Sequence, residues 1–286
     1  MGDSSPEYDP EYARMAAEVR AELKELAEDE SYFFSDDDPG GPRTLQMSTG
    51  LCARLALYCY YLQKGTAYDF RYITQLHEQT HRSFTKSFVT FEAVNAADRS
   101  PITFETCVKH IDDQVTFVPN LWWETQICRV EGSDEADYEW NDGAVNDYYK
   151  GEMPKWLSDN PSAALLCGIL FCVTSSSRLN NQSFMTEKNG WLPLLTEFAF
   201  FTKWNGPLSP AEIEDCRPLI TQRVVVETHG EGEKEPSDKL NAANAIFYIS
   251  FECVEDPTIG HYRAVVRKTM DGKPGHMRLE VTCSKV

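Results

Sequence analysis

The C-terminal part of the chain carries the pattern that most limits its fold. Three runs rich in β-branched and aromatic residues follow one another at about 245–253, 261–268 and 276–283, and the turn pair Asp271-Gly272 separates the last two. Runs of this length joined by short turns usually form neighbouring antiparallel strands. The sequence therefore predicts that the chain ends in an antiparallel sheet, preceded by a further strand at 221–228.

The N-terminal half shows instead the spacing of amphipathic helices. Apolar residues recur there every three to four positions, and a helix at 51–63 would be capped by Ser48 or Thr49 and closed by Gly65. No internal repeat is evident. The predicted fold class is α+β, with helices followed by a C-terminal antiparallel sheet. The other predicted helices and an apolar core element lie at 12–28, 69–87, 103–112, 192–201 and 163–173.

Composition divides the chain into a tail and a domain. Residues 1–40 are predicted to form an acidic tail with one helix, and a loop rich in Asp, Pro and Gly is predicted at 35–42, where the tail meets the domain. Residues 41–286 are numerous enough to bury a core and are predicted to form a single α+β domain. An acidic and aromatic run at 131–151 begins a middle region, about 131–240, that we interpret as an insertion.

Charge and motif content limit the classes of partner and cofactor. The formal net charge of -18 disfavours nucleic acid and anionic membranes as partners and suits a basic protein surface. No apolar run is long enough to span a bilayer, and the N-terminus lacks a signal peptide. Nine cysteines without a C-x-x-C pair fit a reducing, cytoplasmic compartment. No nucleotide-binding loop is present, so no cofactor is expected.

A thiol and an imidazole form the first candidate site. Cys52 stands at the start of a predicted helix, where the helix dipole lowers the pKa of a thiol. The backbone N–H groups around Thr49, Gly50 and Cys52 can face an oxyanion there. His261 begins a predicted strand, where an imidazole can meet a helix N-terminus. A cysteine nucleophile and a histidine base far apart in sequence are typical of cysteine hydrolases.

In the order of its motifs, the chain resembles the ovarian-tumour (OTU) class of papain-like deubiquitinating cysteine proteases. The resemblance implies a papain-like architecture, cleavage of peptide or isopeptide bonds, and ubiquitin or a ubiquitin-like protein as partner. It also implies that Cys52 is the nucleophile, that His261 is the general base, and that Thr49, Gly50 and Cys52 form the oxyanion hole. Arg263 stands where the family often has Asp or Asn, so the third catalytic residue is not identified. The matching segments are Gly50-Leu51-Cys52, Phe70-Arg71, Phe84 to Val89, Phe104-Glu105, Trp122-Trp123-Glu124, Ile246 to Phe251 and His261-Tyr262.

A second motif indicates different chemistry. The run from His77 to His81 matches H-E-x-x-H. On a helix, two imidazoles four residues apart share a face and can bind zinc while the Glu polarises a water molecule. This alternative is a zinc hydrolase with His77 and His81 as ligands and Glu78 as base. A helix with two partly buried histidines explains the same residues without a metal, and we favour that interpretation.

A non-enzymatic role is the remaining alternative. Aromatic residues make up 12% of the chain, and no cofactor motif or third catalytic residue stands out. Such a chain also fits an interaction protein or a viral shell protein. The sequence therefore leaves three classes of function open.

Overall fold

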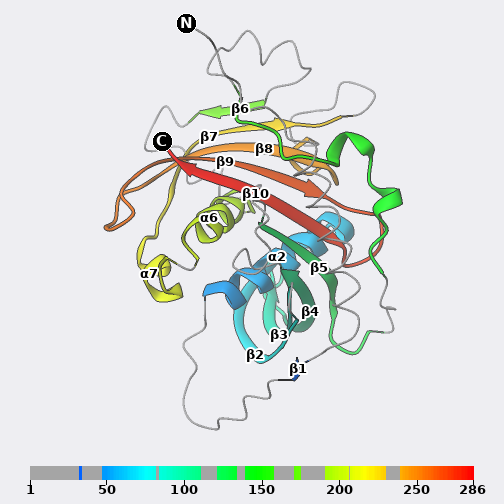
Figure 1. The fold of residues 1–286 in the computed structure, drawn as a ribbon. Coiled ribbons are helices and arrows are strands. Elements are labelled where there is room, and N and C mark those ends of the chain that lie inside the picture. Colours follow the sequence, from blue (N-terminus) through cyan, green and yellow to red (C-terminus); the bar gives the residue numbers. More distant parts are fainter. Residues whose placement is uncertain are drawn as a thin grey trace, which may run out of the picture.

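A single antiparallel sheet dominates the structure, a computed structural model that describes residues 32–33, 47–81, 84–110, 121–133, 139–157, 171–174, 191–205, 207–229 and 239–286. Its ten strands lie in the order β1-β2-β3-β4-β5-β10-β9-β8-β7-β6 (Figure 1). The strands are β1 (Tyr32–Phe33), β2 (Tyr68–Thr80), β3 (Thr85–Asn95), β4 (Pro101–His110), β5 (Leu121–Val130), β6 (Phe171–Thr174), β7 (Ile220–Glu227), β8 (Ala245–Cys253), β9 (Gly260–Thr269) and β10 (Met277–Lys285).

Most of the sheet consists of two units with the same order of elements. In the first unit, helix α2 (Met47–Lys64) is followed by β2 to β5. In the second unit, helices α6 (Trp191–Trp204) and α7 (Pro210–Asp215) are followed by β7 to β10. The last strands of the two units, β5 and β10, pair with each other at the centre of the sheet. The structure thus contains a repeat that the sequence does not reveal, because an apolar face can be built from many combinations of residues.

The core lies where the curved sheet wraps around α2 and α6 (Figure 1). Leu51 and Leu55 of α2, Phe198 of α6 and Phe247 of β8 are all fully buried in one continuous cluster. Both helices are apolar on the faces that meet the sheet, and burial of these faces is the main source of their stability. Among the described helices, none is long and apolar enough to cross a membrane.

The opposite face of the second unit is covered by residues 139–157, which we call the strap. Val224 and Val226 of β7 belong to the core around the helices, whereas Val225 between them packs in a second cluster with Val145 and Tyr149 of the strap. This alternation is the two-residue period of a strand. The strap contains two short 3-10 helices, Asp142–Ala144 and Asp147–Tyr149.

The structure confirms several predicted elements and corrects others. The helices predicted at 51–63 and 192–201 lie within α2 and α6, and the last four predicted strands are β7 to β10. The predictions at 12–28 and at 163–170 lie outside the described residues, as does nearly all of the tail at 1–40.

The helices predicted at 69–87 and 103–112 were wrong, since these segments form β2, the start of β3, and β4. In β3 the buried residues Ser87, Val89, Phe91 and Ala93 alternate with less buried neighbours, which is the period of a strand. The fold is therefore dominated by one sheet, and the prediction of helices followed by a sheet in a papain-like arrangement was also wrong.

Candidate functional site

The thiol of Cys52 is buried inside the molecule. Cys52 is the sixth residue of α2, past the first turn, and only 2% of it is exposed. Burial raises the pKa of the thiol well above its ordinary range, and the nearby Glu78 and Cys107 add to this effect. A thiol in this environment stays protonated at neutral pH and is a weak nucleophile.

His261 lies in the other unit of the sheet. It is exposed at the start of β9, opposite Glu252 of β8, and its carbonyl oxygen accepts a hydrogen bond from the N–H of Val286. Cys52 instead faces the β2 and β4 side, as its electrostatic neighbours indicate. Within the described parts of the chain, no hydrogen bond or ring contact joins Cys52 to His261. Thr49 and Gly50, proposed for the oxyanion hole, belong to the first turn of α2.

The H-E-x-x-H motif lies on a strand and its end instead of on a helix. His77 and Glu78 belong to β2, where neighbouring side chains point to opposite faces, and His81 follows the last residue of the strand. Two positions four residues apart on a strand are separated by about 13 Å, too far for both imidazoles to bind one zinc ion. The carboxylate of Glu78 accepts a hydrogen bond from Ser87. No group of three potential metal ligands is found among the described residues.

The structure brings together a different set of ionisable residues, beginning with Lys268 on β9. Lys268 is fully buried, and its ammonium group donates a 2.8 Å hydrogen bond to the hydroxyl of Tyr58 on α2. The rings of Tyr58, Trp191 and Phe247 surround it at 5.0, 5.7 and 5.5 Å. Cation–π attraction to these rings stabilises the charged form. Burial nevertheless dominates and lowers the pKa of Lys268 to about 7, although the neighbouring Cys59 opposes the shift.

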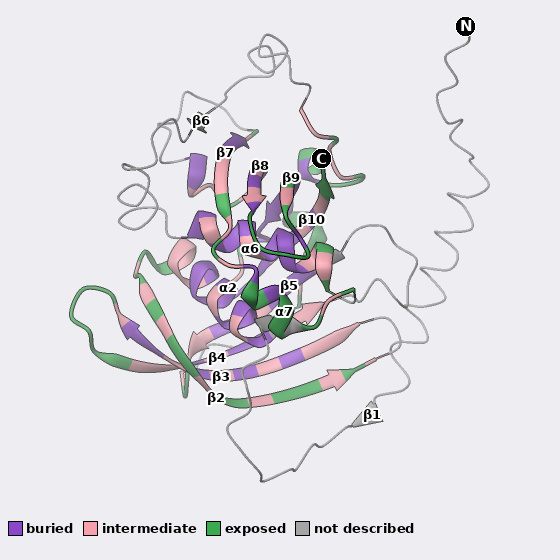
Figure 2. Cartoon of the chain, turned by 90° about the vertical axis from the view of Figure 1, so that its left-hand side faces the viewer, coloured by how far each residue is buried: buried purple, intermediate pink, exposed green. Residues whose placement is uncertain are grey.

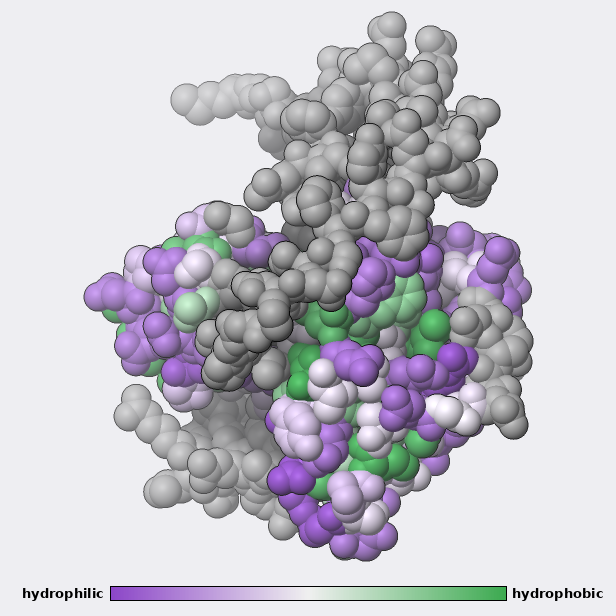
Figure 3. All heavy atoms as spheres, turned by 90° about the horizontal axis from the view of Figure 1, so that it is seen from below, coloured by the Kyte–Doolittle hydropathy of each residue, from purple (hydrophilic) through white to green (hydrophobic). Residues whose placement is uncertain are grey.

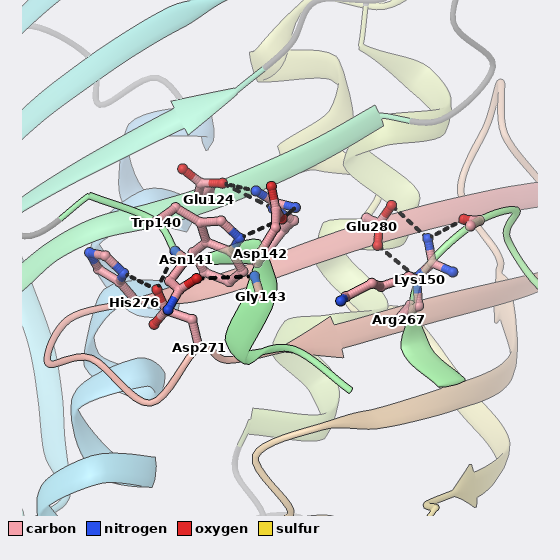
Figure 4. A network of polar contacts seen from close by, with 12 residues as sticks. Glu124, Trp140, Asn141, Asp142, Gly143, Lys150, Arg267, Asp271, His276 and Glu280 are labelled. Atoms are coloured by element: carbon pink, nitrogen blue, oxygen red, sulfur yellow. Dashed lines mark hydrogen bonds and ion pairs between the residues drawn. The ribbon is translucent and has the colours of Figure 1, made fainter. Parts of the chain in front are cut away.

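A buried carboxylate and imidazole follow in the loop between β9 and β10 (Figure 4). Nδ1 of His276 lies 2.8 Å from Asp271, whose carboxylate also accepts the backbone N–H groups of Asn141 and Lys273. Burial alone would raise the pKa of Asp271, but these hydrogen bonds outweigh it and lower the pKa below its ordinary value. The carboxylate is therefore ionised, so Nδ1 of His276 carries the proton. The His276 ring also stacks on Trp140 of the strap.

Helix α2 fixes the other side of the same loop. The side-chain amide of Gln63 donates to the carbonyl of Lys273 and accepts from the N–H of Gly275. Gly275 has a φ of 74°, and a Cβ atom there would lie 2.6 Å from the backbone nitrogen of Cys128 on β5. The loop thus touches α2, β5 and the strap at once. Because Asp271 and His276 are buried and hydrogen-bonded, we infer that this loop holds these elements together.

Two arginines, Arg267 (Figure 4) and Arg278, attach the strap to the sheet. Arg267 of β9 binds both carboxylate oxygens of Glu280 and donates to the carbonyls of Gly151 and Glu152. Arg278 of β10 donates a 3.0 Å hydrogen bond from its guanidinium to the carboxylate of Asp142 in the strap. Charge-assisted bonds of this kind fix geometry strongly.

Arg278 also lies between two indole rings. Its guanidinium is 5.0 Å from the Trp122 ring and 4.3 Å from the Trp140 ring. Two of its nitrogens donate to one oxygen of Glu124 on β5, at 2.9 and 2.6 Å. The pairing of β5 with β10, which joins the two units, is thus reinforced by an ion pair between the partly exposed Arg278 and the buried Glu124.

The exposed polar feature of the first unit is the edge of the sheet at β2. This strand has 13 residues, and its side chains are mostly exposed or half-buried (Figure 2). On its outer side it pairs only with β1, opposite Gln79 and Thr80, within the described residues. The register to β3 is regular from Gln75 to Thr80 and shifts at two places before Gln75. A regular segment of β2 is therefore left without an outer neighbour in the described structure.

The direction of the free backbone groups follows from one hydrogen bond. The N–H of His81 donates to the carbonyl of Phe84, at the end of the β2–β3 hairpin. Because inward and outward groups alternate along an antiparallel strand, Gln79 and His77 also face β3, whereas Glu78 and Leu76 face outward. Leu76 and Glu78 thus present N–H and C=O groups to an added strand.

Sequence analysis missed the open edge of β2 and the buried Lys268, for different reasons. It read β2 as a helix, so its edge was not considered. The available signal was the alternation of apolar and polar residues along β3, which is typical of a strand. A strand that follows a hairpin turn pairs with the segment before the turn, so that segment should be a strand as well. For Lys268 the available signal was the pair Arg267-Lys268, which interrupts an apolar run in a strand that was correctly predicted.

Comparison with known proteins identifies relatives. A family profile described as Protein MS5 matches residues 153–279. A UPF0725 protein of Arabidopsis thaliana is 34% identical over 240 residues, which cover 82% of this chain and 63% of the relative. The chain thus spans less than two thirds of the length of that relative. Another UPF0725 protein of Arabidopsis thaliana is 32% identical over 247 residues, which cover 81% of this chain and 75% of the relative.

A solved structure shares the fold. The crystal structure of MS5 from Brassica napus matches with a TM-score of 0.60 and 19% identity. The match covers 84% of this chain and 99% of that one. These matches overturn the resemblance to OTU-type proteases, and the predictions of a hydrolase, thiol protease or deubiquitinase were therefore wrong. The chain belongs to the UPF0725 protein family.

Proposed function

We propose that this protein is a non-enzymatic interaction protein that binds an extended segment of a partner protein along β2. In this mode the partner segment adds a strand to an open sheet edge, and main-chain hydrogen bonds supply much of the affinity. The observation that carries the proposal is the outward-facing backbone of Leu76 and Glu78 in a regular part of a 13-residue edge strand.

The contact between β1 and β2 supports strand addition at this edge. Tyr32 and Phe33 pair antiparallel with Thr80 and Gln79. The end of the β2 edge therefore already accepts a strand from outside the two units. A partner segment would extend this pairing toward Leu76. The bulges between Phe70 and Gln75 limit it to the regular part, because bulges interrupt the ladder of hydrogen bonds.

The charge of the protein favours a basic segment as the partner. The formal net charge is -18, and such a field attracts cationic ligands and accelerates their association. Glu78 itself lies on the proposed edge and is exposed. Figure 3 shows polar and apolar residues interspersed on the face seen from below.

The chemistry of the thiols also favours binding over catalysis. Burial raises the pKa of Cys52 and of Cys59 well above the ordinary range, and it raises the pKa of Cys283 to about 12. Thiols of this kind are typical of structural cysteines. The expectation of ubiquitin as partner depended on the OTU resemblance, so we base the choice of partner on charge and on the open edge.

The proposal is tested by selecting ligands from a display library of random linear peptides and measuring their affinity for two variants. Glu78→Pro removes an outward N–H group, and proline is tolerated at sheet edges. Glu78→Ala keeps this N–H group while removing the same side chain, so it is the matched control. We expect selected peptides to be basic and to lose at least about tenfold in affinity for Glu78→Pro relative to Glu78→Ala.

Two results would contradict the proposal. One is a set of selected peptides that binds both variants equally well while circular dichroism shows that Glu78→Pro is folded. The other is self-association of the protein through β2 that excludes every peptide, which would make the edge an interface between two copies. If Glu78→Pro does not fold, mapping the bound peptide by NMR on the unmodified protein decides between β2 and another surface.

A further inference from the structure

Two cysteines and a threonine form a compact buried cluster at one end of the second unit. Cys216 follows the last residue of α7, Cys253 ends β8, and Thr258 lies in the turn before β9. All three are fully buried. The hydroxyl of Thr258 lies 3.1 Å from the sulfur of Cys216 and 3.0 Å from the sulfur of Cys253. The two sulfurs are therefore within about 6 Å of each other, and the side chains must rotate toward each other to reach the sulfur–sulfur distance of about 2 Å in a disulfide.

Further contacts hold the two thiols side by side. The sulfur of Cys253 lies 3.6 Å from the carbonyl oxygen of Cys216, and the sulfur of Cys216 contacts the carbonyl of Glu212 one turn earlier in α7. Cys253 also raises the pKa of the Cys216 thiol, directly and through a hydrogen bond, although burial of Cys216 is the larger cause. The pair is thus preorganised by two elements of the fold.

The pair lies close to solvent. Val254 directly follows Cys253, and Ile259 directly follows Thr258, and both are among the most exposed large apolar residues, at 45% and 50%. Because both cysteines are fully buried, access of hydrogen peroxide to the sulfurs requires a displacement of this turn. In contrast, Cys59 and Cys128 lie between α2 and the sheet in the central core.

We propose that Cys216 and Cys253 are an oxidative modification site that a hydroperoxide converts into an intramolecular disulfide. One thiolate attacks an oxygen of hydrogen peroxide and becomes a sulfenic acid, and hydroxide leaves and takes up the thiol proton to form water. The second thiol then attacks the sulfenic sulfur, a sulfur–sulfur bond forms, and a second water leaves. In total, two thiols lose two hydrogen atoms, and one hydroperoxide is reduced to two molecules of water.

The bond would connect the end of α7 to the end of β8. It closes a loop that contains β7, and a crosslink of this kind restricts the unfolded chain. Burial raises the pKa of Cys216, and the hydrogen bond from Thr258 partly opposes the shift. The reaction is therefore expected to be slow at neutral pH and faster at alkaline pH, because the thiolate is the reacting species.

The test is treatment of the folded, reduced full-length chain with hydrogen peroxide at pH 7.5 and pH 9, followed by non-reducing peptide mass spectrometry. We expect a peptide pair linked through Cys216 and Cys253, formed faster at pH 9 and lost on reduction with dithiothreitol. The oxidised protein should unfold at a temperature about 5 °C higher than the reduced protein. The linked pair should be absent in Cys216→Ser and Cys253→Ser and present in Cys128→Ser.

The proposal is overturned if the folded protein yields no linked pair and only sulfinic or sulfonic acids. It is also overturned if linkages to Cys59 or Cys128 form at the same rate, because oxidation would then pass through global unfolding. Both results are read on the unmodified chain, so they do not depend on whether a serine variant folds. Neither result bears on peptide binding at β2.

Discussion

The ammonium group of Lys268 lies 2.8 Å from the hydroxyl of Tyr58, inside a cage of aromatic rings in the core. This contact joins β9 of the second unit to α2 of the first. A lysine here carries a large desolvation cost whenever it is protonated. The stability of the contact between the two units therefore depends on pH through the protonation of Lys268.

We expect Lys268→Met to stabilise the protein at pH 7 and to flatten its pH dependence. The pKa of Lys268 is about 7 in the folded state and 10.5 as the ordinary value. Between these values the unfolded chain binds one more proton, so stability of the unmodified protein rises with pH by about 1.4 kcal/mol per unit. The penalty of protonation is fully present below pH 7 and disappears above pH 10.5.

Urea unfolding at pH 7 and pH 9.5 measures this effect. We expect a gain of about 2 kcal/mol for Lys268→Met at pH 7, after the lost hydrogen bond to Tyr58 is subtracted. Lys150→Met, which changes an exposed lysine of the strap, is the control and should alter stability by less than about 0.5 kcal/mol. An equal pH slope in Lys268→Met and the unmodified protein would refute the titration of Lys268.

Asp271→Asn should destabilise the loop between β9 and β10 and weaken the acid sensitivity of the fold. Asp271 has a pKa below its ordinary value of 3.8, held there by the hydrogen bonds from His276, Lys273 and Asn141 against the effect of burial. Its contribution is therefore present above about pH 4 and is lost as the pH falls through the folded pKa.

Acid unfolding curves provide the measurement. We expect Asp271→Asn to cost about 2–4 kcal/mol at pH 7 and to show a shallower loss of stability below pH 4. Asp147→Asn, at an exposed position paired with Lys150, should change stability very little. If both variants behave alike, the buried network around Asp271 does not stabilise the fold as described.

Removal of the Arg278 guanidinium should loosen the junction of the two units. Arg278→Ala leaves the buried carboxylate of Glu124 without its cation and removes the contacts of the guanidinium with the Trp122 and Trp140 rings, so we expect a loss of about 3–5 kcal/mol. Adding Glu124→Gln should recover part of this loss, because the uncompensated charge is then removed. Arg71→Ala, which breaks the exposed pair with Glu92, should cost less than about 1 kcal/mol.

Chemical denaturation of the unmodified protein, Arg278→Ala, Glu124→Gln and the double variant gives the coupling energy between Arg278 and Glu124. A loss for Arg278→Ala no larger than that for Arg71→Ala would contradict the role of Arg278 at the junction. Strict additivity with Glu124→Gln would also contradict it, since contacting residues are expected to couple.

Gly275 and Gly272 form a matched pair for a test of close packing. Both have a positive φ, 74° and 83°, but a Cβ at Gly275 meets the backbone of Cys128 at 2.6 Å whereas one at Gly272 meets nothing within 4 Å. We expect Gly272→Ala to cost about 1 kcal/mol from backbone strain alone. Gly275→Ala should cost at least about 2 kcal/mol more, because β5 must move. Equal shifts of the thermal midpoint in Gly272→Ala and Gly275→Ala would show that the added Cβ at position 275 does not clash with β5.

The parts of the fold that could be predicted from sequence are those with strong local signals. The last three strands have β-branched residues and clear turns, and α2 has a continuous apolar face that ends at Gly65. The segment of β2 was misread because Ile73, Leu76, Phe84 and Phe88 fall at helical spacing by chance. Ile73 and Leu76 lie on β2, Phe84 precedes β3 and Phe88 lies on β3, and the pairing that joins these strands is not a local property of the sequence.

The candidate sites depend even more on long-range contacts. Lys268 and Tyr58 are far apart in the chain, as are Cys216 and Cys253, and each pair meets only in the folded sheet. Cys52 and His261 matched the order of a protease motif, but order along the chain does not bring side chains together. The fold places them in different units.

Amide hydrogen exchange along β2, measured residue by residue by NMR, tests the proposed binding mode most directly. Without a ligand, the account predicts slow exchange at His77 and Gln79, which bond to β3, and fast exchange at Leu76 and Glu78. A bound basic peptide should slow exchange at Leu76 and Glu78 by at least about 100-fold. Unchanged exchange at these two amides in the presence of a saturating peptide, with protection elsewhere, would contradict strand addition at β2.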